Sequence, residues 1–291
     1  MSNVIDFDAI DANSENLFDV VYEHLALPDS TYLGTRITKK MILENNDLSS
    51  SDKKLVNEVV QSVEWVNTLK RETLNIPTYV TEMVEYTEVA VLKVTLKVDD
   101  LNLGKLKLSI INKVAKLFHT LIPYPVILMI ELDGKLAISL ADKRINQSDS
   151  SKLVIEHYYN SQWFSVVGLK RNEKEFLNDF TLKNVSSVNY YELYQSFISK
   201  LIQLAVSNIS GLYLVDKSVE SNYDANSCSN FNENSNEYKT KILNDIEALE
   251  DKLKAIKTKI KQEKQMNNKL NLNMEAREVK LKIKILKNIV I

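Results

Sequence analysis

The residues with the clearest potential for chemistry follow the most apolar stretch of this sequence. Asp142, Lys143 and Arg144 come directly after an apolar run, where we expect a strand to end, and Glu131 interrupts the preceding run. Carboxylates beside basic side chains are able to hold Mg²⁺ and an activated water against a phosphodiester. One hypothesis is therefore a Mg-dependent nuclease, or another enzyme acting on nucleic acid, with its site at these residues.

Nucleases of the restriction type share a stricter pattern, in which an acid is followed on a neighbouring strand by Asp or Glu two residues before Lys. The triple that begins at Asp52 lies at a predicted helix start, and the triple at Asp133 lies in a predicted turn. Three further matches begin at Glu237, Glu250 and Glu278, all in the C-terminal tail. Because none lies on a predicted buried strand, the sequence favours a protein without a catalytic site.

Other common catalytic and binding motifs are missing from the sequence. It contains neither GxxxxGK[ST] nor GxGxxG, and its five glycines leave little material for a nucleotide-binding loop. It has no GxSxG motif for a serine hydrolase. The three histidines, His24, His119 and His157, are scattered and lack the spacing typical of zinc ligands. We therefore predict no catalytic residues, no metal site and no cofactor.

A predicted β-hairpin positions the polar residues at 142–144. Residues 126–132 form an apolar run typical of a strand buried on both faces. Asp133-Gly134 favours a type I′ turn, because both residues tolerate positive φ, and a two-residue loop then pairs Leu132 with Lys135. One face of the hairpin includes small side chains and is expected to accept a closely packed helix: Val126, Leu128, Ile130, Ala137, Ser139 and Ala141.

The remaining patterns predict a mixed β-sheet covered by helices, which is an α+β fold. The helix predicted at 52–69 has apolar residues at helical spacing and is expected to cover the sheet. A strand, a helix and a buried strand follow one another over 87–132, which favours a βαβ-like crossover. The other predicted elements are strands at 87–98, 153–157 and 163–169, and helices at 15–25, 105–119, 173–180 and 190–206.

Charge is distributed unevenly along the 291 residues, although the formal net charge is only −2. Residues 237–291 carry 14 Lys plus Arg against 8 Asp plus Glu, so this end of the chain is basic. A segment rich in Asn and Ser precedes it. We predict a globular α+β domain at 1–206, a linker at 207–236 and a basic helical tail at 237–291.

Cysteine usage and hydropathy predict a cytoplasmic protein. The single cysteine, Cys228, suits a reducing compartment. The first 16 residues are acidic and lack an apolar signal core. No run of about 18 apolar residues is present to span a membrane, so we expect no membrane partner.

The tail has the pattern of a coiled coil or of an αα-hairpin. Its apolar residues alternate at spacings of four and three, which defines an a/d seam: Ile242, Ile246, Leu249, Leu253, Ile256 and Ile260. The seam breaks at the polar stretch 262–273, and apolar residues resume from Val279. Two arrangements stay open. One is a single long helix with a polar layer, and the other is a pair of antiparallel helices, the second spanning 274–288 with Asn273 as its cap.

Several stretches, taken in order, resemble a bacterial family known as domain of unknown function 4391. They are TRITKKMIL, VEWVNTLKRETLNI, EVAVLKVTLK, IPYPVILMIELDGKLAISLADKRI, HYYNSQW and KIKQEKQMNNKLNLNMEAREVKLKIKIL. The resemblance implies a gene neighbourhood of helicases and DNA methyltransferases, in restriction-like or phage-defence clusters. It offers no catalytic residues.

The resemblance also implies two groups of candidate interaction residues. In the globular part these are Tyr124, Pro125, Lys143, Arg144 and Trp163. In the tail they are Glu263, Lys264, Gln265, Asn267, Lys269 and Asn273.

Three hypotheses follow from these observations. The favoured one is a non-enzymatic adaptor whose partners are a helicase or a DNA methyltransferase of the same system, and whose tail pairs with itself or with such a partner. The second is the enzyme acting on nucleic acid. The third is a DNA-binding module that uses the basic tail together with Lys39 and Lys40, with an affinity that falls steeply as salt is added.

Overall fold

The computed structural model describes residues 5, 7, 16–44, 48–97, 108–149, 153–215 and 229–290. The chain divides into two compact units, one formed by residues 1–201 with 215–220 and the other by residues 202–214 with 221–291. Of the predicted linker, residues 216–228 lie outside the described residues. Helices extend to residue 210 at one end of the predicted linker and begin at residue 229 at the other. The linker boundaries at 207 and 236 stay a prediction.

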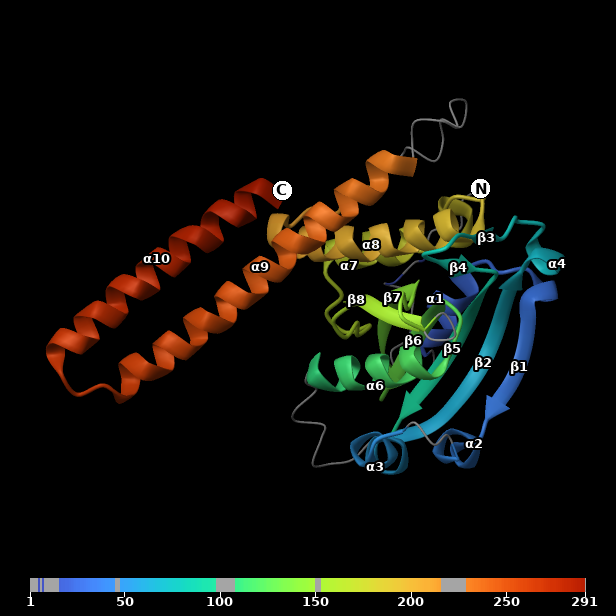
Figure 1. The fold of residues 1–291 in the computed structure, drawn as a ribbon, viewed down its shortest axis with the longest axis horizontal. Coiled ribbons are helices and arrows are strands. Elements are labelled where there is room, and N and C mark those ends of the chain that lie inside the picture. Colours follow the sequence, from blue (N-terminus) through green and yellow to red (C-terminus); the bar gives the residue numbers. More distant parts are fainter. Residues whose placement is uncertain are drawn as a thin grey trace. The chain divides into compact units, whose positions relative to one another are not determined.

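The first unit contains a mixed six-stranded sheet within the described residues, in the order β1-β2-β5-β6-β7-β8 (Figure 1). β5 and β6 pair in parallel through the crossover helix α6 (Leu108–Leu121), and the other neighbours pair antiparallel. This arrangement confirms the α+β fold and the βαβ-like crossover. The strands are β1 (Tyr32–Ile37), β2 (Val60–Lys70), β5 (Glu88–Leu96), β6 (Val126–Leu132), β7 (Lys135–Ile145) and β8 (Leu153–Asn160).

The central hairpin forms with the predicted register. Asp133 and Gly134 have φ angles of 51° and 69°, as a type I′ turn requires, and Leu132 pairs with Lys135. The expectation that the second strand ends before Asp142 was wrong. β7 continues to Ile145, because β8 supplies hydrogen-bonding partners beyond a β-bulge that follows Asp142.

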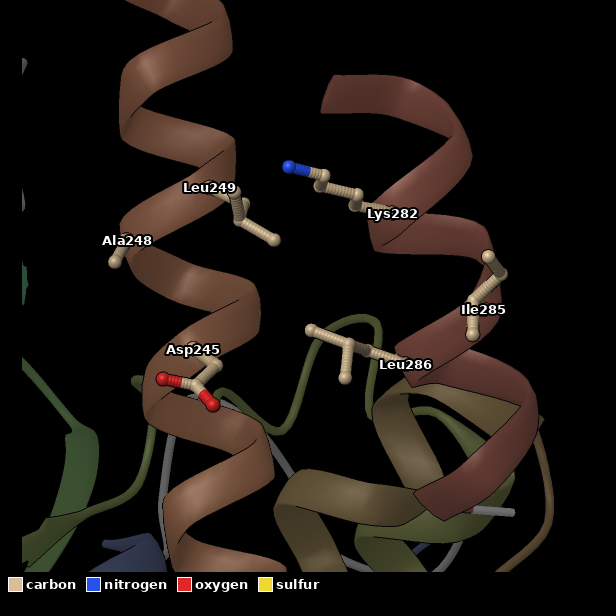
Figure 2. A pocket seen from close by; sticks show the side chains of 6 residues that line it. All are labelled: Asp245, Ala248, Leu249, Lys282, Ile285 and Leu286. Carbon is tan, nitrogen blue, oxygen red and sulfur yellow. The ribbon is translucent and has the colours of Figure 1, made fainter. Parts of the chain in front are cut away.

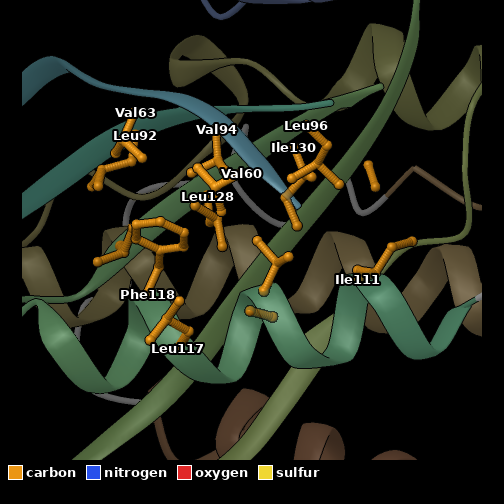
Figure 3. Close-up of a cluster of buried hydrophobic side chains, with 14 of the residues drawn as sticks. Val60, Val63, Leu92, Val94, Leu96, Ile111, Leu117, Phe118, Leu128 and Ile130 are labelled. Atoms are coloured by element: carbon orange, nitrogen blue, oxygen red, sulfur yellow. The ribbon is translucent and has the colours of Figure 1, made fainter. Parts of the chain in front are cut away.

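Helix α6 covers the face of the hairpin that was predicted to accept a helix (Figure 3). Phe118 and Ile111 on α6 are buried with Leu128 and Ile130 on β6, and Ala137 on β7 completes the contact. The small residues of β7 therefore have the predicted role of allowing close approach. Burial of these apolar side chains is the main force that holds α6 on the sheet.

Helices α1 (Leu17–His24) and α8 (Tyr190–Ser210) also contact the sheet. The Tyr194 hydroxyl donates to the carbonyl oxygen of Val126 (2.8 Å) and accepts from the backbone N–H of Ala141 (3.0 Å). Lys93 on β5 lies over the Phe18 ring of α1 at 3.7 Å. Helix α7 (Arg171–Asp179) joins α8 through a buried ion pair between Asp179 and Lys200.

The predicted helix at 52–69 was wrong beyond its first half. Helix α3 (Ser50–Glu58) ends there, and β2 begins at Val60. Two register shifts, at 60–62 and 65–67, turn the strand so that every third residue is buried, as with Val63 and Val66. A strand with β-bulges thus copies the spacing of a helix face.

The predicted strand at 163–169 was also wrong, since only Phe164 forms an isolated bridge, with Leu136. The other predicted elements are present with shifted ends. The short elements are α2 (Lys39–Leu43), α4 (Arg71–Leu74), β3 (Tyr79–Val80), β4 (Glu85–Tyr86) and the 3₁₀ turns at Asp29–Thr31 and Leu182–Asn184.

The second unit is dominated by two long helices, α9 (Ser229–Gln262) and α10 (Met266–Val290), which form an antiparallel hairpin (Figure 1). Of the two arrangements left open, the chain adopts the hairpin. The predicted start of the second helix at 274 was wrong, because α10 begins at Met266 and Asn273 lies inside it. Among the described residues, no helix is long and apolar enough to cross a membrane.

The hairpin is held by an apolar seam and by ion pairs across it. Ile256 on α9 and Ala276, Val279 and Ile283 on α10 are buried. The Lys287 ammonium lies 2.8 Å from the Glu250 carboxylate, and Lys252 lies 3.0 Å from Glu275. We call α9 and α10 together the arm.

Candidate functional site

The tip of the arm is a three-residue turn, Glu263 to Gln265, near the start of the polar break. The Glu263 carboxylate accepts the backbone N–H groups of Lys264 and Gln265, both at 2.8 Å. These bonds, the one from Gln265 foremost, hold the pKa of Glu263 below its usual value. These two bonds, here called the tip cap, hold the three-residue turn that leads into α10, which begins at Met266.

The tip also has an open hollow of about 850 Å³, lined largely by amide and charged side chains. The Asn268 side-chain amide donates to Gln265 Oε1 at 2.9 Å and so fixes one wall. Glu263, Lys264 and Gln265, which are three of the six tail candidates, line the hollow. The other lining residues are Lys259, Gln262, Asn268, Asn271 and Leu272.

The remaining tail candidates lie on α10 and do not line this hollow. Asn267 and Lys269 belong to its first turns and are exposed. Asn273 lies one turn further, and its side-chain amide donates to the carbonyl oxygen of Lys269 at 2.8 Å. The structure thus brings three of the six tail candidates together at the tip and spreads the others along the helix.

A surface that sequence reasoning missed lies along α10. Leu270, Met274, Leu281 and Ile285 are 51–62% exposed. At 100° per residue they fall within roughly 60° of one another around the helix axis. The buried residues of α10 occupy the opposite side, so α10 is apolar on two faces. We call these four residues the outer stripe. Their spacing of four and seven residues was the available signal.

One end of the outer stripe borders a groove of about 410 Å³ between α9 and α10 (Figure 2). Leu249 and Leu286 extend toward one another between the helices, whereas Ile285 lies at the outer side of α10. Asp245 supplies a carboxylate on α9, and Lys282 supplies an ammonium on α10. An apolar floor with opposite charges at its rim is suited to a peptide more than to a metal ion.

In the first unit, the structure brings Lys143 and Tyr124 together through the backbone. Lys143 is buried on β7, and its ammonium donates to the carbonyl oxygens of Ile122 and Tyr124, each at 2.5 Å. Burial lowers the pKa of Lys143 to about 7. On α6, burial and then the neighbouring Lys143 lower the pKa of His119 well below its usual value. Lys143 therefore ties the α6–β6 loop to the sheet.

The other globular candidates make separate contacts. Arg144 pairs with Glu156 on β8 at 2.8 Å, with both side chains about one-third exposed. The Tyr124 ring packs edge-to-face against Trp65 at 6.4 Å, and the nearby Glu88 carboxylate raises the pKa of Tyr124. Trp163 is half-buried against the main core cluster. Pro125, which precedes β6, accepts the Ala90 N–H through its carbonyl oxygen. The five residues do not form one surface.

The carboxylates proposed for a nuclease site are held apart. Glu131 pairs with Lys93 at 3.0 Å and accepts from the Asn16 amide. Asp142 accepts from Tyr159 on β8 (2.7 Å) and from Gln195 on α8 (2.8 Å), and burial raises its pKa. Glu131 aligns with Leu136, seven residues from Lys143, which corresponds to roughly 20 Å along a strand.

The surroundings of the acidic residues of the nuclease hypothesis, and of the lysines of the DNA-binding hypothesis, bear on what each function would need. Across the described ranges no three His, Cys, Asp or Glu side chains gather in a way that could hold a metal ion. Lys40 on α2 pairs with Glu44 at 3.8 Å. Partial burial, and then the neighbouring Lys97, lower the pKa of Lys39.

Comparison with known proteins adds one finding to this geometry. A search of curated proteins and a search of solved structures each gave no match. A family model described as Domain of unknown function (DUF4391) matches residues 25–283, a range that includes the sheet, α8 and nearly all of the arm. This chain therefore belongs to the DUF4391 family.

Proposed function

We propose that this protein is a non-enzymatic accessory subunit of a bacterial phage-defence or restriction-modification-like system. It works in the cytoplasm and bridges DNA-processing partners, namely a helicase and a DNA methyltransferase. The observation that carries the proposal is the second apolar face of α10. One face is used by α9, and the outer stripe is left for another protein. An exposed apolar surface of this kind is typical of protein–protein contact sites.

The separation of the titratable groups in the first unit supports a binding role over an enzymatic one. Lys143 is engaged by two carbonyl oxygens, and Asp142 is engaged by Tyr159 and Gln195 on the other side of the strand. Glu131 is paired with Lys93. Each group thus already has a structural partner.

Co-purification tests the proposal. The full chain would be expressed with an affinity tag beside each helicase and DNA methyltransferase found to be encoded near its gene. We expect at least one of them to be retained at a fixed ratio through size-exclusion chromatography. Absence of both from the purified complex would reject the accessory role.

Two parallel measurements address the alternatives. Cleavage of DNA or RNA by the purified protein with Mg²⁺, abolished by Asp142→Asn, would favour the nuclease. Binding to a DNA duplex that weakens steeply as salt rises would favour the DNA-binding module, because each neutralised phosphate releases counterions. We expect neither result for the protein alone.

A further inference from the structure

The outer stripe has the dimensions of a site for one further helix. It runs from Leu270 to Ile285, which at 1.5 Å per residue is roughly 22 Å. Leu270 and Met274 are one turn apart, and so are Leu281 and Ile285. The middle pair, Met274 and Leu281, is two turns apart, with Arg277 and Glu278 in the interval. A single amphipathic helix of about 15 to 20 residues would cover this length, much as helices fill apolar grooves elsewhere.

One edge of the stripe is cationic. Arg277, Lys280 and Lys284 are exposed and follow one another along the same side of α10. No ion pair is recorded for these three side chains within the described part of the arm. By contrast, Lys287 and Lys252, which lie nearer the seam, are paired with Glu250 and Glu275. The cationic edge is therefore charge left over after the arm has formed.

The charge balance of α10 decides between possible occupants. Residues 266–290 contain six Lys plus Arg and two Glu, so pairing α10 with α10 of a second copy would bring two positive helices together. Nucleic acid would meet the cations but would leave Leu281 and Met274 against polar phosphates. An anionic partner with an apolar stripe of its own satisfies both features of the surface.

We infer that the outer stripe and the cationic edge of α10 form a docking site for an acidic amphipathic helix of a partner protein. The partner's apolar residues pack on Leu270, Met274, Leu281 and Ile285, and its Asp or Glu side chains face Arg277, Lys280 and Lys284. The docked helix makes the arm a three-helix bundle. This inference rests on the proposed accessory function and names the chemistry of the segment by which a partner is held.

Two designed peptides of about 20 residues are suitable probes, both with Leu at a and d positions. One carries Glu at all flanking positions, and the other carries Lys there. Fluorescence anisotropy of each labelled peptide, titrated with the full-length protein, gives the affinity. We expect the Glu peptide to bind, and the Lys peptide to bind at least about tenfold more weakly because it repels the cationic edge.

Matched variants then locate the site on the arm. Leu281→Ser should lower the affinity for the Glu peptide by about tenfold or more. Val167→Ser, at a 78% exposed position of the first unit, should leave that affinity unchanged. Lys280→Glu with Lys284→Glu should weaken it similarly. Lys257→Glu with Lys261→Glu makes the same change of charge at exposed positions of α9 and should have a much smaller effect. Circular dichroism checks that each variant keeps its helices.

Several results would overturn the inference. They are no binding of the Glu peptide, equal binding of both peptides, or equal effects of the α9 and α10 charge variants. A dimer in ultracentrifugation that Leu281→Ser abolishes would assign the stripe to a second copy. Binding to phosphatidylcholine–phosphatidylglycerol vesicles that the same variant abolishes would assign it to a membrane. If the helicase or methyltransferase still co-purifies in any of these cases, the accessory role stands and only this docking site is rejected.

Discussion

The buried ammonium of Lys143 donates to the carbonyl oxygen of Tyr124 at 2.5 Å. A second bond reaches the carbonyl oxygen of Ile122, so one side chain of β7 closes the loop that leads from α6 into β6. The amine is almost fully buried, and burial lowers its pKa to about 7. Lys143, which the sequence placed among the candidate interaction residues, is thus a buried side chain that holds this loop to the sheet and has a pH-dependent charge.

The burial of Lys143 predicts a specific pH dependence of the free energy of unfolding. In the folded protein Lys143 is neutral above about pH 7, whereas in the unfolded chain it stays protonated up to its ordinary pKa of 10.5. Between these values the unfolded state binds one more proton, so the free energy of unfolding rises with pH, by at most about 1.4 kcal/mol per unit. Below about pH 7 both states are protonated and this contribution stays constant.

Urea unfolding at several pH values from about 7 to 9 measures the effect. Lys143→Met should remove the rise that Lys143 contributes, so the difference between wild type and variant should change steadily with pH. Lys135→Met, on the same strand but partly exposed, is the matched control and should give a constant difference. A difference for Lys143→Met that does not vary with pH would contradict the prediction.

A second prediction concerns the buried ion pair between Lys200 and Asp179, whose charged atoms lie 2.7 Å apart. Asp179→Asn removes the negative charge that offsets the buried Lys200 ammonium and should lower the free energy of unfolding by about 3–5 kcal/mol. Adding Lys200→Met removes that charge and should recover much of the loss. At the exposed pair Lys54–Glu58, Glu58→Gln should cost less than about 1 kcal/mol. Additive losses in the double variant would contradict the assignment.

The sequence was sufficient for the centre of the fold and insufficient where β-bulges occur. Asp133-Gly134 and the apolar run before it determined the hairpin and its register, because turn type and strand pattern agree there. In β2 the bulges bury Val60, Val63, Val66 and Leu69, and this spacing of three cannot be told from a helix by periodicity alone. Only the pairing with β1 and β5 resolves it.

The site was predictable in composition and not in geometry. The tip lies within the polar break, but the place where the chain reverses, at 263–265, depends on side-chain bonds of Glu263 that spacing does not reveal. Val279, Leu281, Ile283 and Ile285 are the apolar residues that resume after the polar break. Because residues two apart lie about 200° apart around a helix axis, alternate members point to opposite faces, and two of them belong to the outer stripe.

The cap at the tip gives a third prediction. Glu263→Ala should increase the rate of hydrogen exchange at Lys264 and Gln265, in the turn before α10, because their N–H groups lose their acceptor. Glu263→Gln keeps a carbonyl oxygen and should have a smaller effect. Glu278→Ala, in the middle of the same helix, is the control. Unchanged exchange at the tip in Glu263→Ala would contradict the capping role.

The same cap should titrate visibly. The folded pKa of Glu263 is below its ordinary value of 4.5, so the cap is fully present above that value and is lost as pH falls through the folded pKa. The amide resonance of Gln265 in NMR should therefore shift with a midpoint below 4.5. A midpoint at or above 4.5 would show that the carboxylate gains nothing from these bonds.

The last prediction compares two isoleucines of α10 that are two residues apart. Ile283 is 7% exposed and faces α9, whereas Ile285 is 51% exposed and belongs to the outer stripe. Ile283→Asn buries an amide without partners and removes apolar contacts, so it should lower the stability of the arm by about 2–5 kcal/mol and reduce helical circular dichroism. Ile285→Asn should change stability by less than about 0.5 kcal/mol, because its side chain stays in water in the free protein. Ile285→Asn should nevertheless lower the affinity for the Glu peptide, since binding removes that side chain from water. Reversed stabilities would mean that the outer stripe, and not the seam, holds the arm together.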